Sequence, residues 1–189
     1  FRYYVIAIFI LLFLKYPMEA HSAETIKFLL SFKNIENTGK WIVVNDDVMG
    51  GVSKSNVYLH SDGYLIFAGD LSTDYGGGFA SIRTYHTNWQ VGNYEGIILK
   101  VKGDGKTYQF RCRLANNLNQ IAYRHYFNTN ENDWQRIFLP FKDFLPTYRG
   151  RVLRNLPKID PEKISQFGIM ISDKQVGNFK LKIDWIGVY

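Results

Sequence analysis

The stretch that decides the fold is Gly96-Ile97-Ile98-Leu99-Lys100-Val101-Lys102, because apolar and charged side chains alternate along it with a period of two. Ile97, Leu99 and Val101 fall on one face of an extended chain, whereas Lys100 and Lys102 fall on the other. This pattern is typical of a strand with one buried and one solvated face in an antiparallel sheet. The Gly103-Asp104-Gly105 sequence that follows suits positive φ angles and predicts a tight hairpin.

Similar short runs, rich in β-branched and aromatic residues, recur along the chain between clusters of Gly, Asn and Asp. They predict strands over 41–45, 56–60, 64–71, 80–84, 96–102, 107–114, 123–128, 135–140, 166–172 and 180–189. Helix is scarce: residues 26–34 fit a short amphipathic helix, and residues 160–164 fit one helical turn capped by Asp160. Strands do not alternate with long helices, so the predicted fold class is all-β, a sandwich or barrel.

The size and composition of the chain indicate a single domain. The sequence has 189 residues, of which 46% are hydrophobic and 16% aromatic, enough for one sizeable core. The 23 Lys and Arg exceed the 17 Asp and Glu, but the basic residues are scattered singly, so nucleic-acid binding is not expected. Cys112 is the single cysteine, and the alternation of residues 108–114 predicts a buried, unreactive thiol.

The first 23 residues have the pattern of a targeting segment. Arg2 precedes an apolar run from Val5 to Leu14, and the small residues Ala20 and Ala23 offer a cleavage site. Residues 1–23 are therefore predicted to be a signal peptide and residues 24–189 a single mature domain, exported and either periplasmic or secreted. The alternative is an uncleaved anchor, in which case this segment would be the membrane contact.

Four stretches carry a family signature: Trp41 to Ser53, which contains Asn45-Asp46-Asp47-Val48-Met49-Gly50-Gly51; Gly76 to Arg83, which begins with three glycines; Leu139 to Gly150; and Gly168 to Gln175. In this order and at these separations they resemble the complex I intermediate-associated protein family, named for an assembly factor of NADH:ubiquinone oxidoreductase. The resemblance extends from Trp41 to Tyr189. It implies a galactose-binding-like jelly-roll β-sandwich, in agreement with the predicted strands.

The resemblance implies a role in holding other proteins. Mitochondrial members of the family act as chaperones for assembly intermediates, which would make this chain a non-enzymatic binding or chaperone-like module with a protein partner. The chain departs from that pattern by carrying an export signal in place of an Arg-rich transit peptide, so we expect it to act in the cell envelope. A carbohydrate-binding module is the alternative, favoured by the sandwich architecture and the aromatic content.

The candidate binding residues are charged and stand on one strand face or at predicted strand ends. They are Asp46, Asp47, Arg83, Arg111, Arg149, Asp173 and Lys174. If the sandwich brings them together, they form a mixed-charge groove that can grip carboxylates or sugar hydroxyls. For the arginines the alternative is that they are solvated or ion-paired surface residues, each of which contributes little. For Asp46 and Asp47 we favour a structural role, because Asp at a turn commonly accepts hydrogen bonds from neighbouring backbone N–H groups.

The patterns of metal, cofactor and catalytic sites are missing from the sequence. The four histidines show none of the spacings of zinc sites, and no Gly-x-Ser-x-Gly elbow occurs. Gly76-Gly77-Gly78 does not match a dinucleotide-binding loop, because Ser81 stands at the position of its third glycine. We therefore expect no metal, no cofactor and no enzymatic activity, with a hydrolase that uses paired carboxylates as the remaining alternative.

Overall fold

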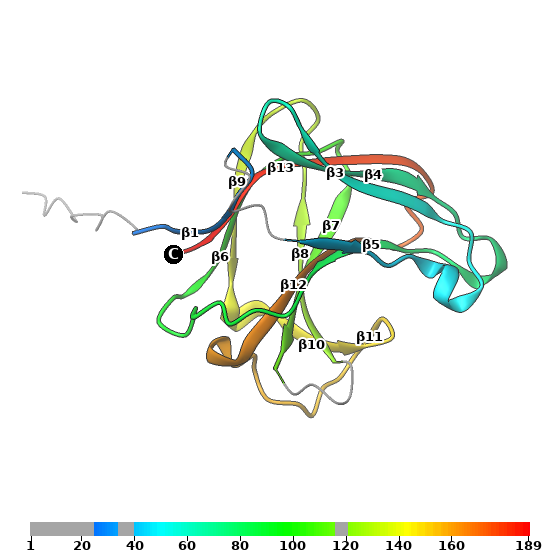
Figure 1. The fold of residues 1–189 in the computed structure, drawn as a ribbon. Coiled ribbons are helices and arrows are strands. Elements are labelled where there is room, and N and C mark those ends of the chain that lie inside the picture. The colour runs from blue at the N-terminus through cyan, green and yellow to red at the C-terminus, as the bar shows by residue number, and fades with distance from the viewer. Residues whose placement is uncertain (1–24, 34–39, 116–120) are drawn as a thin grey trace, which may run out of the picture.

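The computed structural model describes residues 25–33, 40–115 and 121–189, which form two stacked antiparallel sheets (Figure 1). The first sheet has, in spatial order, β3 (Lys54–His60), β4 (Tyr64–Leu71), β13 (Gly177–Val188), β6 (Gly96–Lys102) and β9 (Gln135–Pro140), and β1 (Lys27–Ser31) pairs with the end of β13. The predicted all-β sandwich is therefore confirmed.

The second sheet has seven strands. Their spatial order is β11 (Arg151–Val152), β10 (Leu145–Tyr148), β8 (Ala122–Asn128), β7 (Thr107–Leu114), β12 (Ile164–Ile171), β5 (Ala80–Thr84) and β2 (Trp41–Val43). Among the described residues, short 3-10 helices connect strands at η2 (Asp46–Met49), η3 (Asp74–Gly76), η4 (Phe141–Asp143) and η5 (Pro161–Lys163). In the part of the chain that the structure describes, no helix has the length and hydropathy to cross a membrane.

The core lies between the two sheets, where the alternation of the strands brings apolar side chains from both inner faces together. On β6, Ile97, Leu99 and Val101 are fully buried, as their spacing predicted. On β7, Phe110 and Cys112 are fully buried, so the predicted burial of the thiol is confirmed. Burial also raises the pKa of Cys112 well above its ordinary value, which disfavours the nucleophilic thiolate.

The amphipathic helix predicted over residues 26–34 is wrong, because residues 27–31 form the strand β1. The last residues of β13 extend past β4, and β1 pairs with them from Lys27↔Val188 to Ser31↔Trp185. Figure 1 shows β1 beside the C-terminus. The segment places Leu30 and Phe32 in the core, and burial against an open strand edge outweighs a short local helical pattern.

The tight hairpin predicted at Gly103-Asp104-Gly105 is also wrong, because β6 and β7 belong to different sheets. Residues 103–106 carry the chain from one layer of the sandwich to the other. The Asp104 carboxylate holds this crossing by accepting hydrogen bonds from the Tyr108 hydroxyl at 3.0 Å and the Lys180 backbone N–H at 2.8 Å. Positive φ occurs at Gly105, as expected, but it serves a connection between layers.

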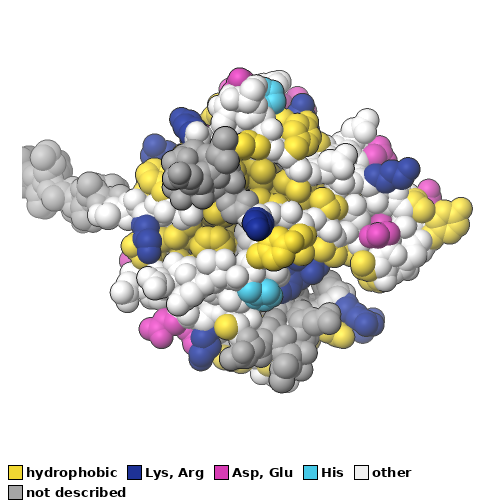
Figure 2. Space-filling view, viewed as in Figure 1, with side chains coloured by type: hydrophobic (Ala, Val, Ile, Leu, Met, Phe, Trp, Pro, Cys, Tyr) yellow, Lys and Arg dark blue, Asp and Glu magenta, His cyan; other side chains and the backbone are white. Residues whose placement is uncertain are grey.

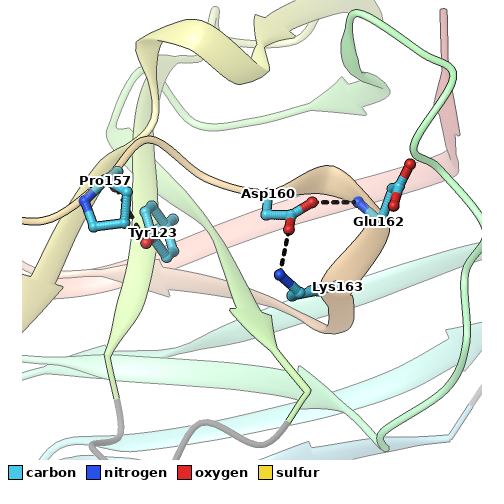
Figure 3. A network of polar contacts seen from close by, with 5 residues as sticks. All are labelled: Tyr123, Pro157, Asp160, Glu162 and Lys163. Carbon is cyan, nitrogen blue, oxygen red and sulfur yellow. Dashed lines mark hydrogen bonds and ion pairs between the residues drawn. The ribbon is translucent and has the colours of Figure 1, made fainter.

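The single helical turn predicted at residues 160–164 is confirmed as η5 (Figure 3). The Asp160 carboxylate accepts a hydrogen bond from the Glu162 backbone N–H at 3.2 Å, and its other oxygen pairs with Lys163 Nζ at 2.7 Å. The nearby Tyr123 hydroxyl donates to the Pro157 carbonyl at 3.3 Å. These contacts fix the chain as it enters β12, a strand in the middle of the second sheet.

The position of Cys112 gives the first prediction. A thiol reagent should label the native protein at least ten times more slowly than the urea-unfolded protein, because the side chain is inaccessible until the sandwich opens. Cys112→Ser should lower the free energy of unfolding by about 1–3 kcal/mol by burying a hydroxyl in apolar surroundings. Fast labelling of the native protein, followed by mass spectrometry of the peptide, would contradict the burial.

Candidate functional site

A buried carboxylate joins the two glycine-containing stretches of the sequence signature. Asp46 has no exposed surface. Its carboxylate oxygens accept hydrogen bonds from the Ser53 backbone N–H at 2.9 Å and from the Ser53 hydroxyl at 2.6 Å. The backbone N–H groups of Gly78 and Phe79 donate to the same carboxylate at 2.7 and 3.3 Å. One side chain therefore ties the loop after β2 to the loop before β5.

The glycines of both stretches make room for this carboxylate. A Cβ on Gly51 would lie 2.6 Å from Asp46 Oδ1, and a Cβ on Gly77 would lie 2.5 Å from Asp46 Oδ2. Both distances are too short for any side chain. Gly50 serves a different need, since its φ of 89° ends η2 in the left-handed region.

Asp46 and Asp47 have different roles in the structure. Burial alone would raise the pKa of Asp46, but the hydrogen bonds from Ser53, Gly78 and Phe79 outweigh it and hold the pKa below its ordinary value. Asp46 thus takes the structural role favoured for this pair, although the donors come from more distant loops than expected. Asp47 is exposed on η2.

A cleft of about 1020 Å³ lies over the outer face of the second sheet. Its floor comes from β5, β7, β8 and β12, and its rim from the loops at η2, at Gly76–Gly78 and between β10 and β11. Five arginines line it: Arg83, Arg111, Arg113, Arg124 and Arg149. Asp173 is the single carboxylate among the described residues that line the cleft.

The structure brings four of the seven candidate binding residues to this cleft. Arg83, Arg111, Arg149 and Asp173 line it, whereas Asp46 lies buried behind its rim and both Asp47 and Lys174 are exposed outside it. Two arginines of the floor, Arg113 and Arg124, are not among those seven residues. Period-two alternation assigns both to outer strand faces, but only the pairing of β7 with β8 shows that the two faces adjoin.

Three arginines of the floor, Arg111, Arg113 and Arg124, have neutral hydrogen-bond partners. Arg111 is only 7% exposed and donates to Gln109 Oε1 at 3.0 Å and to Thr147 Oγ1 at 3.4 Å. Arg113 donates to Gln166 Oε1 at 3.3 Å, and Arg124 to the Gly150 carbonyl at 3.5 Å. These bonds orient the guanidinium groups without neutralising them.

The electrostatic state of the floor follows from burial and repulsion. Burial, and then the charges of Arg83 and Arg124, lower the pKa of Arg111 to about 10. Burial, and then Arg83 and Arg111, lower the pKa of Arg113 to about 9. Both side chains remain cationic at neutral pH, so the free cleft holds concentrated positive charge.

Strained backbone surrounds the cleft. Tyr75, Arg149, Asp173 and Lys174 have φ between 45° and 63°, in the left-handed region that non-glycine residues rarely adopt. All four stand in the loops at or next to the rim. Such conformations tend to gather at binding sites, where the surrounding structure enforces them.

A metal-binding cluster and a pair of acids in the cleft are both missing from the described residues. No group of three His, Cys, Asp or Glu side chains within them is placed to hold a metal ion. The cleft has Asp173 alone as a carboxylate, so the paired acids of a glycoside hydrolase do not meet there.

A family model described as complex I intermediate-associated protein 30 matches residues 30–183. The chain belongs to this family. Curated members include the mitochondrial protein of Mus musculus, 27% identical over 92% of this chain and 59% of that protein, and the probable one of Caenorhabditis briggsae, 27% identical over 84% and 52%. An uncharacterized protein of Schizosaccharomyces pombe is 31% identical over 76% of this chain and 74% of its own length. The chain spans about half the length of the first two relatives.

Solved structures with a similar fold include carbohydrate-binding modules, which confirms the galactose-binding-like sandwich fold. The family 11 module of the cellulase Lic26A-Cel5E of Clostridium thermocellum superposes with a TM-score of 0.66 over 88% of this chain and 95% of the module. The sequences are 16% identical, so the similarity concerns the fold. An agarase contains a similar domain, with a TM-score of 0.59, 11% identity, and coverage of 86% of this chain and 24% of the enzyme.

The family corrects one prediction made from the N-terminal segment. Export to the periplasm or the medium is wrong, because the named relatives from Mus musculus, Drosophila melanogaster and Caenorhabditis are mitochondrial proteins. A positive charge followed by a short apolar run is a local pattern that does not by itself specify the compartment. Residues 1–24, which contain the predicted signal peptide, lie outside the described residues.

The Asp46 network predicts a large stability effect. Asp46→Asn should lower the free energy of unfolding by about 2–4 kcal/mol, because an amide cannot accept all four hydrogen bonds and leaves buried donors unpaired. Urea unfolding followed by tryptophan fluorescence measures the change. Asp47→Asn is the matched control and should stay within about 0.5 kcal/mol of the wild type. Equal effects of the two substitutions would contradict the assignment.

The lowered pKa of Asp46 also predicts how this stability depends on pH. Its contribution is complete above the pKa of the unfolded chain, about 3.9, and is lost as the pH falls through the lower pKa of the folded state. The difference in unfolding free energy between wild type and Asp46→Asn should therefore narrow as the pH falls below about 4. A difference that is constant with pH would show that the carboxylate charge contributes nothing.

Proposed function

We propose that this chain is a non-enzymatic binding module that holds a protein partner during the assembly of complex I, in the mitochondrion. The family supports the class of role, because its curated members are named for association with complex I intermediates. The cleft and its rim are the basis on which we propose a protein partner and the surface that contacts it.

The observation that carries this proposal is an apolar lip on the cleft, formed by Val48, Met49 and Tyr75. Val48 and Met49 of η2 line the cleft yet are 68% and 63% exposed, and Tyr75 on the neighbouring loop is 81% exposed. Figure 2 shows hydrophobic side chains at the right-hand end of the molecule, the end that carries η2 in Figure 1. Exposed apolar side chains beside a polar cleft are typical of protein–protein contact.

The rigidity of the lip supports the same role. The Asp46 carboxylate anchors both loops that present these side chains, so the lip is held in position before a partner arrives. A pre-ordered apolar surface binds with a smaller loss of conformational entropy than a flexible one.

A carbohydrate ligand is the second candidate, and the chemistry of the cleft supports it less. Sugar-binding faces use uncovered aromatic rings, but the guanidinium of Arg149 lies 5.5 Å from the centre of the Tyr148 ring and covers it. The five arginines also make the cleft too strongly charged for a neutral glycan.

Capture of complex I intermediates tests the proposal. The full chain is immobilised and exposed to detergent-solubilised mitochondrial membranes, and retained material is probed for complex I subunits. Val48→Ser/Met49→Ser should reduce their retention about tenfold or more, because removing each apolar side chain from the interface weakens binding by about 1.5 kcal/mol or more.

Tyr58→Ser is the matched control, since Tyr58 is also an exposed hydrophobic residue, 49% exposed, but lies on β3 in the other sheet. It should retain complex I subunits as the wild type does. Absence of these subunits from the wild-type capture, or equal retention by the double variant, would contradict the proposal.

A further inference from the structure

Three arginines on the floor of the cleft stand in one row across four strands. Arg83 of β5 is opposite Gly168 of β12, Gly168 is opposite Arg111 of β7, and Arg111 is opposite Arg124 of β8. Residues opposite one another in neighbouring strands present their side chains to the same face of a sheet. We call Arg83, Arg111 and Arg124 the arginine row. Arg113 lies beside it, two residues along the same face of β7.

Gly168 places no side chain in the middle of this row. A Cβ at this position would lie 3.1 Å from the Ile82 carbonyl oxygen, 3.5 Å from Arg83 Cγ and 3.9 Å from Arg111 Cβ, so both arginine side chains pass close to the Gly168 backbone. The backbones of β5 and β7 that carry the two arginines are about two strand spacings or roughly 10 Å apart. No side chain of β12 at this position therefore stands between the two arginines on the floor of the cleft.

The positive charge of the row has no counter-charge in the described part of the protein. Within residues 25–33, 40–115 and 121–189, no carboxylate oxygen lies within 4.0 Å of any arginine nitrogen of the row. Asp173, the carboxylate of the cleft, is 3.5 Å from Gln109 Nε2 and lies on the rim. The Nε–H groups of Arg111 and Arg124 are buried and donate to no acceptor among these residues.

Arg111 is buried and Arg83 and Arg124 are half-buried, all without a counter-charge among the described residues, and such guanidinium groups are costly and fit a specific class of ligand. A charge removed from water without a partner destabilises the folded protein, and repulsion within the row adds to that cost. The lowered pKa values of Arg111 and Arg113 report the same unfavourable surroundings. Guanidinium groups form paired, charge-assisted hydrogen bonds with phosphate and carboxylate oxygens, which would supply both the missing charge and the missing acceptors.

We propose that the arginine row binds a compact ligand with several oxyanion charges, carried by phosphate groups or by several carboxylates. The cleft volume of about 1020 Å³ is that of a small-molecule site, and its floor is built on hydrogen-bonded strands that hold the donors in place. This ligand is additional to the protein partner at the lip, and its binding does not depend on that partner.

Titration calorimetry with the purified full chain tests the proposal, with inorganic pyrophosphate and citrate as separate probes in a phosphate-free buffer of low ionic strength. Wild-type protein should bind at least one of them, and affinity should fall steeply as the ionic strength rises from about 0.02 M to about 0.2 M. Binding of pyrophosphate alone would identify a phosphate ligand, binding of citrate alone a polycarboxylate, and binding of both recognition by charge.

Arg83→Gln and Arg124→Gln should each weaken binding about tenfold or more, since each removes one charge-assisted contact from the row. Arg136→Gln, an exposed arginine on β9 in the other sheet, removes the same net charge and should leave the affinity unchanged. The two row variants lie on different strands, so a folding defect in one leaves the other as a test, and circular dichroism checks both.

Two results would overturn the inference: no binding of either anion by the wild type at low ionic strength, or equal weakening by Arg136→Gln and the row variants. Because this experiment uses the chain alone, its failure would leave protein capture at the lip untouched. Failure of capture would likewise leave anion binding intact.

Discussion

The hydrogen bonding of the buried Asp46 carboxylate is the interaction on which the binding face depends. Its donors are Ser53, 7 residues further along the chain, and Gly78 and Phe79, 32 and 33 residues further along, and the carboxylate has no exposed surface. Separating the loops would leave a buried charge and several backbone N–H groups without partners. The same loops form the rim of the cleft and present Val48, Met49 and Tyr75, so this single carboxylate fixes the shape of the rim and the exposure of the apolar lip.

The floor of the cleft is organised by the opposite kind of constraint. Around Asp46 every oxygen is satisfied, whereas the arginine row carries charge and donors that the described residues leave unmatched. The sheet can carry this cost because the inner faces of the same strands bury Phe110, Cys112 and Phe167 in the core. Stability is thus supplied by one face of β7 and β12, and binding capacity by the other.

The sequence signature supplies most of the rim of the cleft, whereas Arg111, Arg113 and Arg124 of its floor lie outside the signature. Part of the signature serves the packing of the loops. In the Asn45-Asp46-Asp47-Val48-Met49-Gly50-Gly51 stretch, Gly51 must leave space for the Asp46 carboxylate. The carbohydrate-binding modules share the sandwich at 16% identity because two stacked antiparallel sheets accept many different residues on their outer faces. In this chain the outer face of the second sheet carries arginines, and we therefore propose an oxyanion ligand on the same fold.

Local patterns in the sequence were enough to locate most strands and to assign the buried face of each. Five strands were predicted with the bounds that the structure has, because period-two alternation is a local property of the chain. They are Tyr64–Leu71, Ala80–Thr84, Gly96–Lys102, Thr107–Leu114 and Gln135–Pro140. Which strands are neighbours depended on the folded chain as a whole. Residues 27–31 are a strand because they pair with the open edge of β13. Gly103-Asp104-Gly105 connects the two sheets because β6 and β7 belong to different sheets. It also aligned Arg83, Arg111 and Arg124 in one row, since that register depends on pairing between segments separated by up to about 85 residues, where local sequence patterns carry no information.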